Sequence, residues 1–267
     1  MARLRAIASL AALVSVTCVL LPAQMAAVRL RLRAGQRIPV LWHRTVLRIC
    51  GLRITEQGRP AGDRPLLILS NHVSWLDIPV IGSRLPLSFI AKAEVEGWPV
   101  FGLLARLQRT VFVDRTRRTG TGRASRAIAE RLENGDPMVL FPEGTSSSGN
   151  EVLPFRSALV GAARHALGSG EGTVLVQPLS IAYTRRGGLP MGRQWRPLVA
   201  WYGDMDLAPH LWSFLKAGPV EAVLTWGEPI AFGPGSDRKM VTAAAEEAVR
   251  AMTGAALTGR PRPADAP

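Results

Sequence analysis

The stretch LLILSNHVSWLDIP, residues 66–79, decides the fold class. It begins with the apolar run Leu66–Leu69, which is short and bounded by polar residues, and therefore predicts a strand buried on both faces. Pro79 is a favoured residue in the first turn of a helix and predicts a short helix over Ile78–Ser83. A buried strand followed by a helix is the unit from which layered α/β domains are built.

The same alternation continues downstream. Further strands are expected at Leu87–Ala91, Thr110–Val113, Met138–Phe141, Leu198–Tyr202 and Val220–Trp226, with an extended run at Val174–Tyr183 that Pro178 breaks. Helices are expected at Trp98–Gln108, Thr121–Glu133, Arg156–Leu167 and Lys239–Thr253. This order predicts a single layered α/β domain at residues 51–255, with a mixed, largely parallel sheet covered by helices, and a disordered tail at residues 256–267.

Upstream of the domain, residues 6–28 form a run of 23 residues without a charged side chain. A helix of that length can cross a hydrocarbon core of about 30 Å. A cleaved signal peptide has a similar outline, with basic residues, an apolar stretch and small residues. The length of the run and the basic sequence after it favour a retained transmembrane or membrane-anchor segment at residues 1–28.

Residues 29–50 mix arginines with large apolar residues and Trp42, which predicts a basic interfacial helix. An ordinary amphipathic surface helix would have the same periodicity but would not need the adjacent apolar run. The four arginines in residues 29–37 outnumber the two in residues 1–5. The positive-inside rule therefore places the domain on the cytoplasmic face of the inner membrane.

Composition narrows the class of partner. Thirty-three Lys and Arg against 20 Asp and Glu give a net charge of +13, which suits nucleic acid, an anionic membrane or acidic ligands. No helix-turn-helix, zinc or RNA-recognition pattern is present, so nucleic acid is not expected as a partner. Two cysteines exclude a disulfide framework. Charge alone would still allow a membrane-anchored module that binds anionic lipid.

His72 and Asp77 follow the first strand directly. On a continuous helix they would lie about 140° apart, so they can meet only across a turn, which the end of the strand supplies. A carboxylate bonded to one imidazole nitrogen fixes the tautomer and leaves the other nitrogen as a general base. The alternative is that Asp77 caps the helix and His72 is an ordinary loop residue.

The second polar loop, FPEGTSSSG at residues 141–149, also follows a buried strand. Gly144 lets the backbone approach a ligand, neighbouring N–H groups could hold a developing oxyanion, and Glu143 could orient a hydroxyl-bearing acceptor. A simple polar turn has the same composition. Ser148 stands where Gly-x-Ser-x-Gly needs its second glycine, which disfavours a membrane-bound esterase.

Five blocks occur in one order: NHVSWLD from residue 71, FIAKAE from 89, VFVDR from 111, FPEGT from 141 and VQP from 176. Together they resemble the lysophosphatidic acid and glycerolphosphate acyltransferase family. The resemblance implies a membrane-bound O-acyltransferase that moves a fatty acyl group from the thioester of acyl carrier protein or coenzyme A to the free hydroxyl of a lysolipid. It implies His72 as the general base and Asp77 as the residue that orients it.

The resemblance also implies acceptor residues. Glu143, Gly144 and Thr145 lie in the block that helps to bind the acceptor or the tetrahedral intermediate, and Lys92 and Arg115 match basic positions associated with the headgroup. No metal and no cofactor is implied, because a thiolate leaves with little acid help. The implied partners are the lysolipid acceptor, acyl carrier protein and membrane lipids.

One departure bears on the acceptor. The phosphatidate-forming branch usually carries arginine after Glu-Gly-Thr, where this chain has Ser146. Without that phosphate donor, residues 145–150, 108–115 and 200–207 look more like the branch that acylates lyso-ornithine lipid to ornithine lipid. The alternative is a dedicated 1-acyl-glycerol-3-phosphate acyltransferase that gives phosphatidate.

Overall fold

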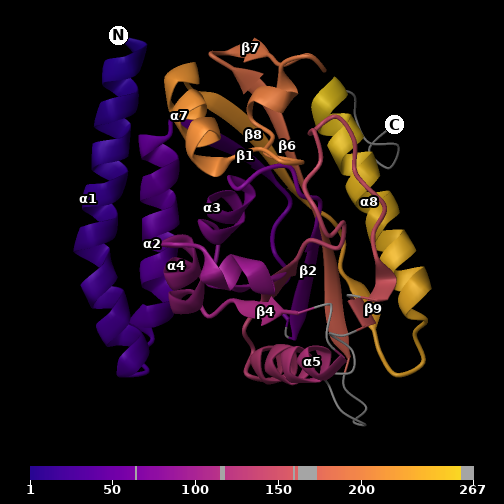
Figure 1. Cartoon of the computed structure of the whole chain (residues 1–267). Coiled ribbons are helices and arrows are strands. Elements are labelled where there is room, and N and C mark those ends of the chain that lie inside the picture. The colour runs from indigo at the N-terminus through magenta and orange to yellow at the C-terminus, as the bar shows by residue number, and fades with distance from the viewer. Residues whose placement is uncertain (64, 115–117, 159, 162–172, 260–267) are drawn as a thin grey trace.

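The computed structural model describes residues 1–63, 65–114, 118–158, 160–161 and 173–259. These residues form a mixed α/β domain around one twisted sheet, with helices on both faces (Figure 1). The main path of the sheet has the order β1-β8-β6-β2-β5-β3-β4, and β7 and β9 pair with β6. The predicted fold class, with a largely parallel sheet covered by helices, is confirmed.

The strands are β1 (Leu52–Gln57), β2 (Leu66–Ser70), β3 (Ser88–Lys92), β4 (Val111–Val113), β5 (Met138–Leu140), β6 (Val174–Arg186), β7 (Leu189–Pro190), β8 (Val220–Trp226) and β9 (Ile230–Phe232). The helices are α1 (Ala2–Arg29), α2 (Ala34–Ile49), α3 (Asp77–Gly82), α4 (Phe101–Leu107), α5 (Arg118–Glu133), α7 (Leu207–Ala217) and α8 (Arg238–Thr258), with 3₁₀ turns η1 (Ala93–Gly97) and η2 (Arg196–Leu198).

Strand β2 lies at the centre of the sheet, parallel to both neighbours, β5 and β6. Its side chains alternate between two apolar cores because successive residues of a strand point to opposite faces. Leu66 and Ile68 pack into the core under α2, α3 and α7, whereas Leu67 and Leu69 pack into the core under α5 and α8. All four residues are fully buried, as the continuous apolar run predicts.

Helix α1 forms the outermost layer, packed along α2 (Figure 1). It is long and apolar enough to cross a membrane, and it has only three buried residues. Near one end, the Arg5 guanidinium donates to the carbonyl of Lys216 in α7. Near the other end, Gln24 Nε2 donates to the carbonyls of Gly35 (2.9 Å) and Leu107 (2.8 Å). This exposed apolar helix suggests membrane anchoring and is fastened to the domain near both ends.

Two predictions within the domain are wrong. Leu198–Tyr202 is not a strand: η2 occupies its start, and the N–H groups of Val199 and Ala200 both donate to the carbonyl of Arg196. Its centre, Val199 and Ala200, is buried, whereas Leu198 is 42% exposed. Pro178 does not break the extended run, because it lies where the antiparallel partner of β6 changes from β9 to β8. A proline there removes no hydrogen bond between β6 and those two strands.

Other boundaries also differ from the sequence-based expectation. The helix predicted at Trp98–Gln108 begins only at Phe101, after a tight turn in which the Phe101 N–H donates to the Pro99 carbonyl (2.7 Å). Strands β1, β7 and β9 and helix α7 were not predicted. The helix expected at Arg156–Leu167 and the expected disordered tail fall largely on residues outside the described part of the chain.

Candidate active site

The two polar loops lie side by side at one edge of the sheet. His72 follows the carboxyl end of β2 and Glu143 follows the carboxyl end of β5, and these strands are parallel neighbours with Leu69 opposite Leu140. The Ser147 N–H donates to the His72 carbonyl (2.8 Å), so the loops are joined directly. The two loops therefore lie where ligand sites of α/β sheets usually form, outside the carboxyl ends of the strands.

His72 and Asp77 meet across the turn between β2 and α3. The Nδ1 atom of His72 lies 2.7 Å from Oδ2 of Asp77, and the same oxygen accepts the N–H groups of Val73 (2.7 Å) and Ser74 (2.9 Å). Asp77 is the first residue of α3, and Leu76 precedes it as the N-cap, so Asp77 does not cap this helix. Asp77 is fully buried, whereas the His72 side chain is 21% exposed.

The second oxygen of Asp77 has a partner that the sequence analysis missed. The hydroxyl of Tyr183, on β6, donates to Oδ1 of Asp77 at 2.7 Å. Burial and the adjacent Asp77 charge raise the pKa of Tyr183 well above 10, which keeps the hydroxyl protonated as a donor. The two residues lie 106 positions apart, so no local motif could connect them.

The plane of the His72 ring is set by stacking. Its centroid lies 4.1 Å from that of Phe141, with 20° between the rings, and Phe141 lies 6.3 Å from Phe89. Asn71 fastens the loop to β6: its Nδ2 donates to the Ile181 carbonyl (2.9 Å) and its Oδ1 accepts the Ile181 N–H (2.8 Å). Within the described part of the chain, Nε2 of His72 has no hydrogen-bond partner, which leaves it open to a ligand.

Glu143 contacts the backbone of the loop that carries His72. Its Oε1 accepts the backbone N–H of His72 at 3.2 Å, and the residue is only 2% exposed. Burial raises the pKa of Glu143 to about 8, with the charge of Asp77 adding to the effect, so the carboxyl carries a proton at neutral pH. Its second oxygen, Oε2, has no partner among the described residues.

Beyond Glu143, the loop at residues 141–149 contacts both His72 and the segment at residues 199–206. Gly144 has a φ of 76°, a conformation that glycine adopts without strain, and Thr145 is exposed. The Ser146 hydroxyl donates to the carbonyl of Trp201, and the Trp201 N–H donates to the Val73 carbonyl (2.9 Å). Trp201 therefore joins both loops, a role that its remote position in the sequence did not reveal.

The two expected headgroup residues have different outcomes. Lys92 ends β3, which pairs with β5, and its side chain is exposed at the same edge of the sheet. Arg115 lies outside the described residues.

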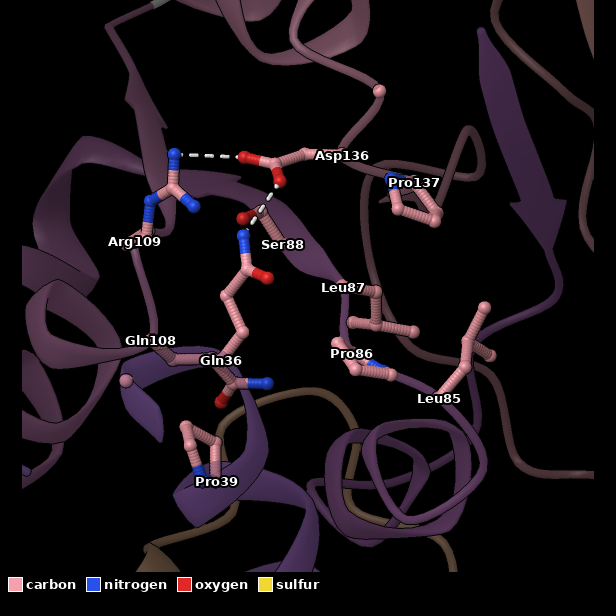
Figure 2. Close-up of a pocket in the computed structure, with 12 residues that line it drawn as sticks. Gln36, Pro39, Leu85, Pro86, Leu87, Ser88, Gln108, Arg109, Asp136 and Pro137 are labelled. Atoms are coloured by element: carbon pink, nitrogen blue, oxygen red, sulfur yellow. Dashed lines mark hydrogen bonds and ion pairs between the residues drawn. The ribbon is translucent and has the colours of Figure 1, made fainter. Parts of the chain in front are cut away.

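A separate pocket lies at the opposite edge (Figure 2). It is lined in part by Ser88 and Pro137, which stand at the amino ends of β3 and β5. An ion pair between Arg109 and Asp136 (2.7 Å) and a hydrogen bond from Gln36 to Asp136 (3.1 Å) cross it, as Figure 2 shows. Because His72 and Glu143 follow the carboxyl ends of the strands, this pocket is not the candidate active site.

Comparisons with known proteins agree with this geometry. Residues 51–182 match the acyltransferase family. The lyso-ornithine lipid O-acyltransferase of Brucella abortus (strain 2308) is 47% identical over 95% of both chains, and that of Rhizobium meliloti (strain 1021) is 44% identical over 94% of this chain and 87% of its own length. The crystal structure of the 1-acyl-sn-glycerophosphate (LPA) acyltransferase PlsC from Thermotoga maritima has the same fold, with a TM-score of 0.58 and 22% identity over 95% of this chain and 97% of that one. With relatives this similar over nearly its full length, the chain belongs to the acyltransferase family.

Proposed function

We propose that this protein is a membrane-bound lysolipid O-acyltransferase whose principal acceptor is lyso-ornithine lipid, which it converts to ornithine lipid. The observation that carries the proposal is the oriented pair of His72 and Asp77, with Nε2 of His72 unbonded beside a glycine-containing loop. Two relatives above 40% identity that bear the lyso-ornithine lipid activity in their names support the choice of acceptor.

In the proposed reaction, His72 is the general base and Asp77 is its orienting partner. Because Asp77 accepts from Nδ1, the neutral imidazole carries its proton there and presents the lone pair of Nε2. Nε2 removes the proton of the acceptor hydroxyl as that oxygen attacks the thioester carbonyl, and the C–S bond breaks in the collapse of the tetrahedral intermediate. The proton on Nε2 then passes to the departing thiolate, which restores the neutral base.

The loop that begins at Glu143 is proposed to serve the intermediate and the acceptor. Gly144, with positive φ, and the exposed Thr145 lie where backbone N–H groups could face a developing oxyanion. Glu143 is proposed to position the backbone of His72 through Oε1, from beneath the surface of the site, because the residue is only 2% exposed.

The acceptor proposal depends on Ser146. Its hydroxyl is bonded to the Trp201 carbonyl, so this position supplies neither a cation nor a free donor to a phosphate. Such a site suits an acceptor whose hydroxyl lies on an alkyl chain, as in lyso-ornithine lipid, better than one whose hydroxyl is close to a phosphate. The exposed Lys92 keeps 1-acyl-glycerol-3-phosphate as the second candidate.

We place the site at the cytoplasmic face of the inner membrane, with acyl carrier protein or coenzyme A as the carrier of the acyl thioester. The apolar surface of α1 supports contact with the membrane, and the arginines at residues 29–37 suit the anionic cytoplasmic leaflet. Because α1 is fastened to α4 and α7 near its two ends, the domain lies along the helix, close to the membrane.

The test is a radiolabelled acyl-transfer assay on membranes that contain the full chain, with both acceptors and both thioester donors. We expect ornithine lipid as the main product. Ser146→Arg should raise the ratio of phosphatidate to ornithine lipid several-fold, because it introduces a phosphate-binding cation and removes the bond to Trp201. Exclusive formation of phosphatidate by the wild type would overturn the choice of acceptor, and failure to acylate either lipid would overturn the function.

A further inference from the structure

The turn between η1 and α4 exposes three large apolar side chains. Trp98 is 37% exposed, Val100 is 62% exposed and Phe101 is 43% exposed. We call residues 98–101 the apolar turn. Single exposed apolar residues are ordinary on soluble domains, but a cluster within four residues marks an interaction site.

The backbone of this turn is strained. Val100 has a φ of 63° and a ψ of −55°, and the Phe101 N–H donates to the Pro99 carbonyl at 2.7 Å, which is a γ-turn of the rare, strained kind. A β-branched residue rarely adopts positive φ. Gly102 fixes the end of the turn. Its N–H donates to the Trp98 carbonyl (2.9 Å), and its backbone approaches so closely that a Cβ on Gly102 would lie 2.1 Å from a backbone oxygen. Strain of this kind concentrates at functional sites.

The apolar turn contacts Trp201, the residue that joins the two loops of the candidate active site. The Trp98 and Trp201 rings meet edge to face, with centroids 5.8 Å apart. The Trp201 N–H bonds the carbonyl of Val73, next to His72, and its carbonyl accepts the Ser146 hydroxyl. One residue, Trp201, therefore separates the apolar turn from both loops of the site.

The apolar turn is also continuous with α1. It begins α4, and Leu107 at the other end of α4 accepts a hydrogen bond from Gln24 of α1. The seven residues of α4 span about 10 Å at 1.5 Å per residue, so the apolar turn lies about that distance from the contact between α4 and α1. Of the charged groups at this turn, Glu96 lies within 4.0 Å of Arg106, which offsets its charge.

We propose that the apolar turn inserts into the lipid bilayer beside α1 and forms a second membrane contact at the mouth of the active site. Aromatic side chains are enriched at the level of the lipid headgroups, where Trp98 would lie, and the turn would bury Val100 and Phe101 deeper. The acceptor hydroxyl then reaches Nε2 of His72 while the acyl chain of the acceptor stays in the membrane. This inference rests on the proposed lysolipid acceptor for its purpose, but membrane insertion is measurable without turnover.

The activity test uses Val100→Asp, since aspartate tolerates positive φ better than valine and preserves the turn. The matched control is Met240→Asp, because Met240 is 69% exposed on α8, which lies across the sheet from α1 (Figure 1). With the acceptor in phosphatidylcholine–phosphatidylglycerol vesicles, Val100→Asp should lose about tenfold in turnover and Met240→Asp less than twofold. With a short-chain acceptor in free solution, both variants should match the wild type. Equal losses with both forms of acceptor, or no loss with vesicles, would overturn the proposal.

The insertion test uses vesicles of brominated phosphatidylcholine, which quench only tryptophans that enter the bilayer. Both variants are made in a Trp42→Phe background, because Trp42 of α2 belongs to the predicted interfacial helix and would itself be quenched. Trp98→Phe should then remove most of the bromine-sensitive fluorescence, whereas Trp226→Phe should leave it unchanged because Trp226 is only 4% exposed. Bromine-sensitive fluorescence that persists undiminished in Trp98→Phe would refute insertion of the turn. A protein that inserts this turn but acylates no lysolipid would refute the proposed function alone.

Discussion

Replacement of Tyr183 by phenylalanine isolates one hydrogen bond of the network around the proposed base, His72. Asp77 accepts four hydrogen bonds, from His72, Val73, Ser74 and Tyr183, and only the last reaches Oδ1. The substitution removes one oxygen atom from a residue that is 3% exposed and leaves the three contacts to Oδ2 in place. Phenylalanine fills nearly the same volume, so the packing of β6 is preserved.

The magnitude follows from the chemistry of the bond. A hydrogen bond to an ionised group contributes about 1.5–3 kcal/mol. If about half of that energy serves to hold Asp77 in the geometry that orients His72, its loss costs about 0.75–1.5 kcal/mol of transition-state stabilisation, which is roughly three- to tenfold in kcat. The loss should fall on kcat and not on the KM for the acceptor, because Asp77 contacts the proposed base.

The assay is acyl transfer with kcat and the KM for the acceptor measured separately. The control is Tyr202→Phe, because Tyr202 is the only other tyrosine of the chain and packs at the edge of the same core. We expect Tyr183→Phe to lower kcat about three- to tenfold, with the KM for the acceptor within twofold, and Tyr202→Phe to leave both within twofold. An unchanged kcat in a folded Tyr183→Phe protein, or a loss confined to KM, would refute the reasoning.

Three further predictions concern the same network. His72→Ala should lower acyl transfer by at least a hundredfold while the protein stays in the membrane fraction, and activity above a few per cent would exclude the general-base role. Asp77→Asn should lower kcat far more than it raises the KM for the acceptor; a change confined to KM would contradict its orienting role. Burial raises the pKa of Glu143 to about 8 from its ordinary 4.5, so the folded state binds an extra proton between these values and loses stability as the pH rises through that window. Glu143→Gln should therefore flatten the decline in melting temperature between about pH 5 and pH 8, and an unchanged decline would show that another group causes it.

Local patterns predicted the centre of the fold because its elements are specified locally. The strand at Leu66–Leu69 and the helix that begins near Pro79 are each specified by a run of a few residues. Predictions from local sequence fail where a partner that is remote in the chain decides the structure. Pro178 lies harmlessly inside β6 only because two different strands pair on either side of it. Leu198–Tyr202 has the composition of a strand, but it starts in the 3₁₀ turn η2, and the Trp201 N–H bonds the carbonyl of the remote Val73.

The same difference between local and remote contacts applies to the candidate site. His72 and Asp77 were predicted to meet because four residues and one turn separate them, and the structure places them 2.7 Å apart. Tyr183 and Trp201 were missed as members of the network because their contacts depend on how the whole sheet is ordered. A single sequence shows which residues are chemically capable, but it does not show which distant hydroxyl or carbonyl completes their hydrogen bonds.

The fastening of α1 near both ends has a consequence for biogenesis. Gln24 bonds a carbonyl 83 residues later in the chain, and Arg5 bonds one 211 residues later. At a synthesis rate of roughly 5–20 residues per second, Arg5 waits roughly 10–40 s after leaving the ribosome before its partner exists. The first helix to be made thus gains its contact with α7 only after most of the chain has been synthesised. During that interval its exposed apolar surface needs a lipid bilayer or a chaperone, so we expect the domain to assemble onto an anchor that is already in place.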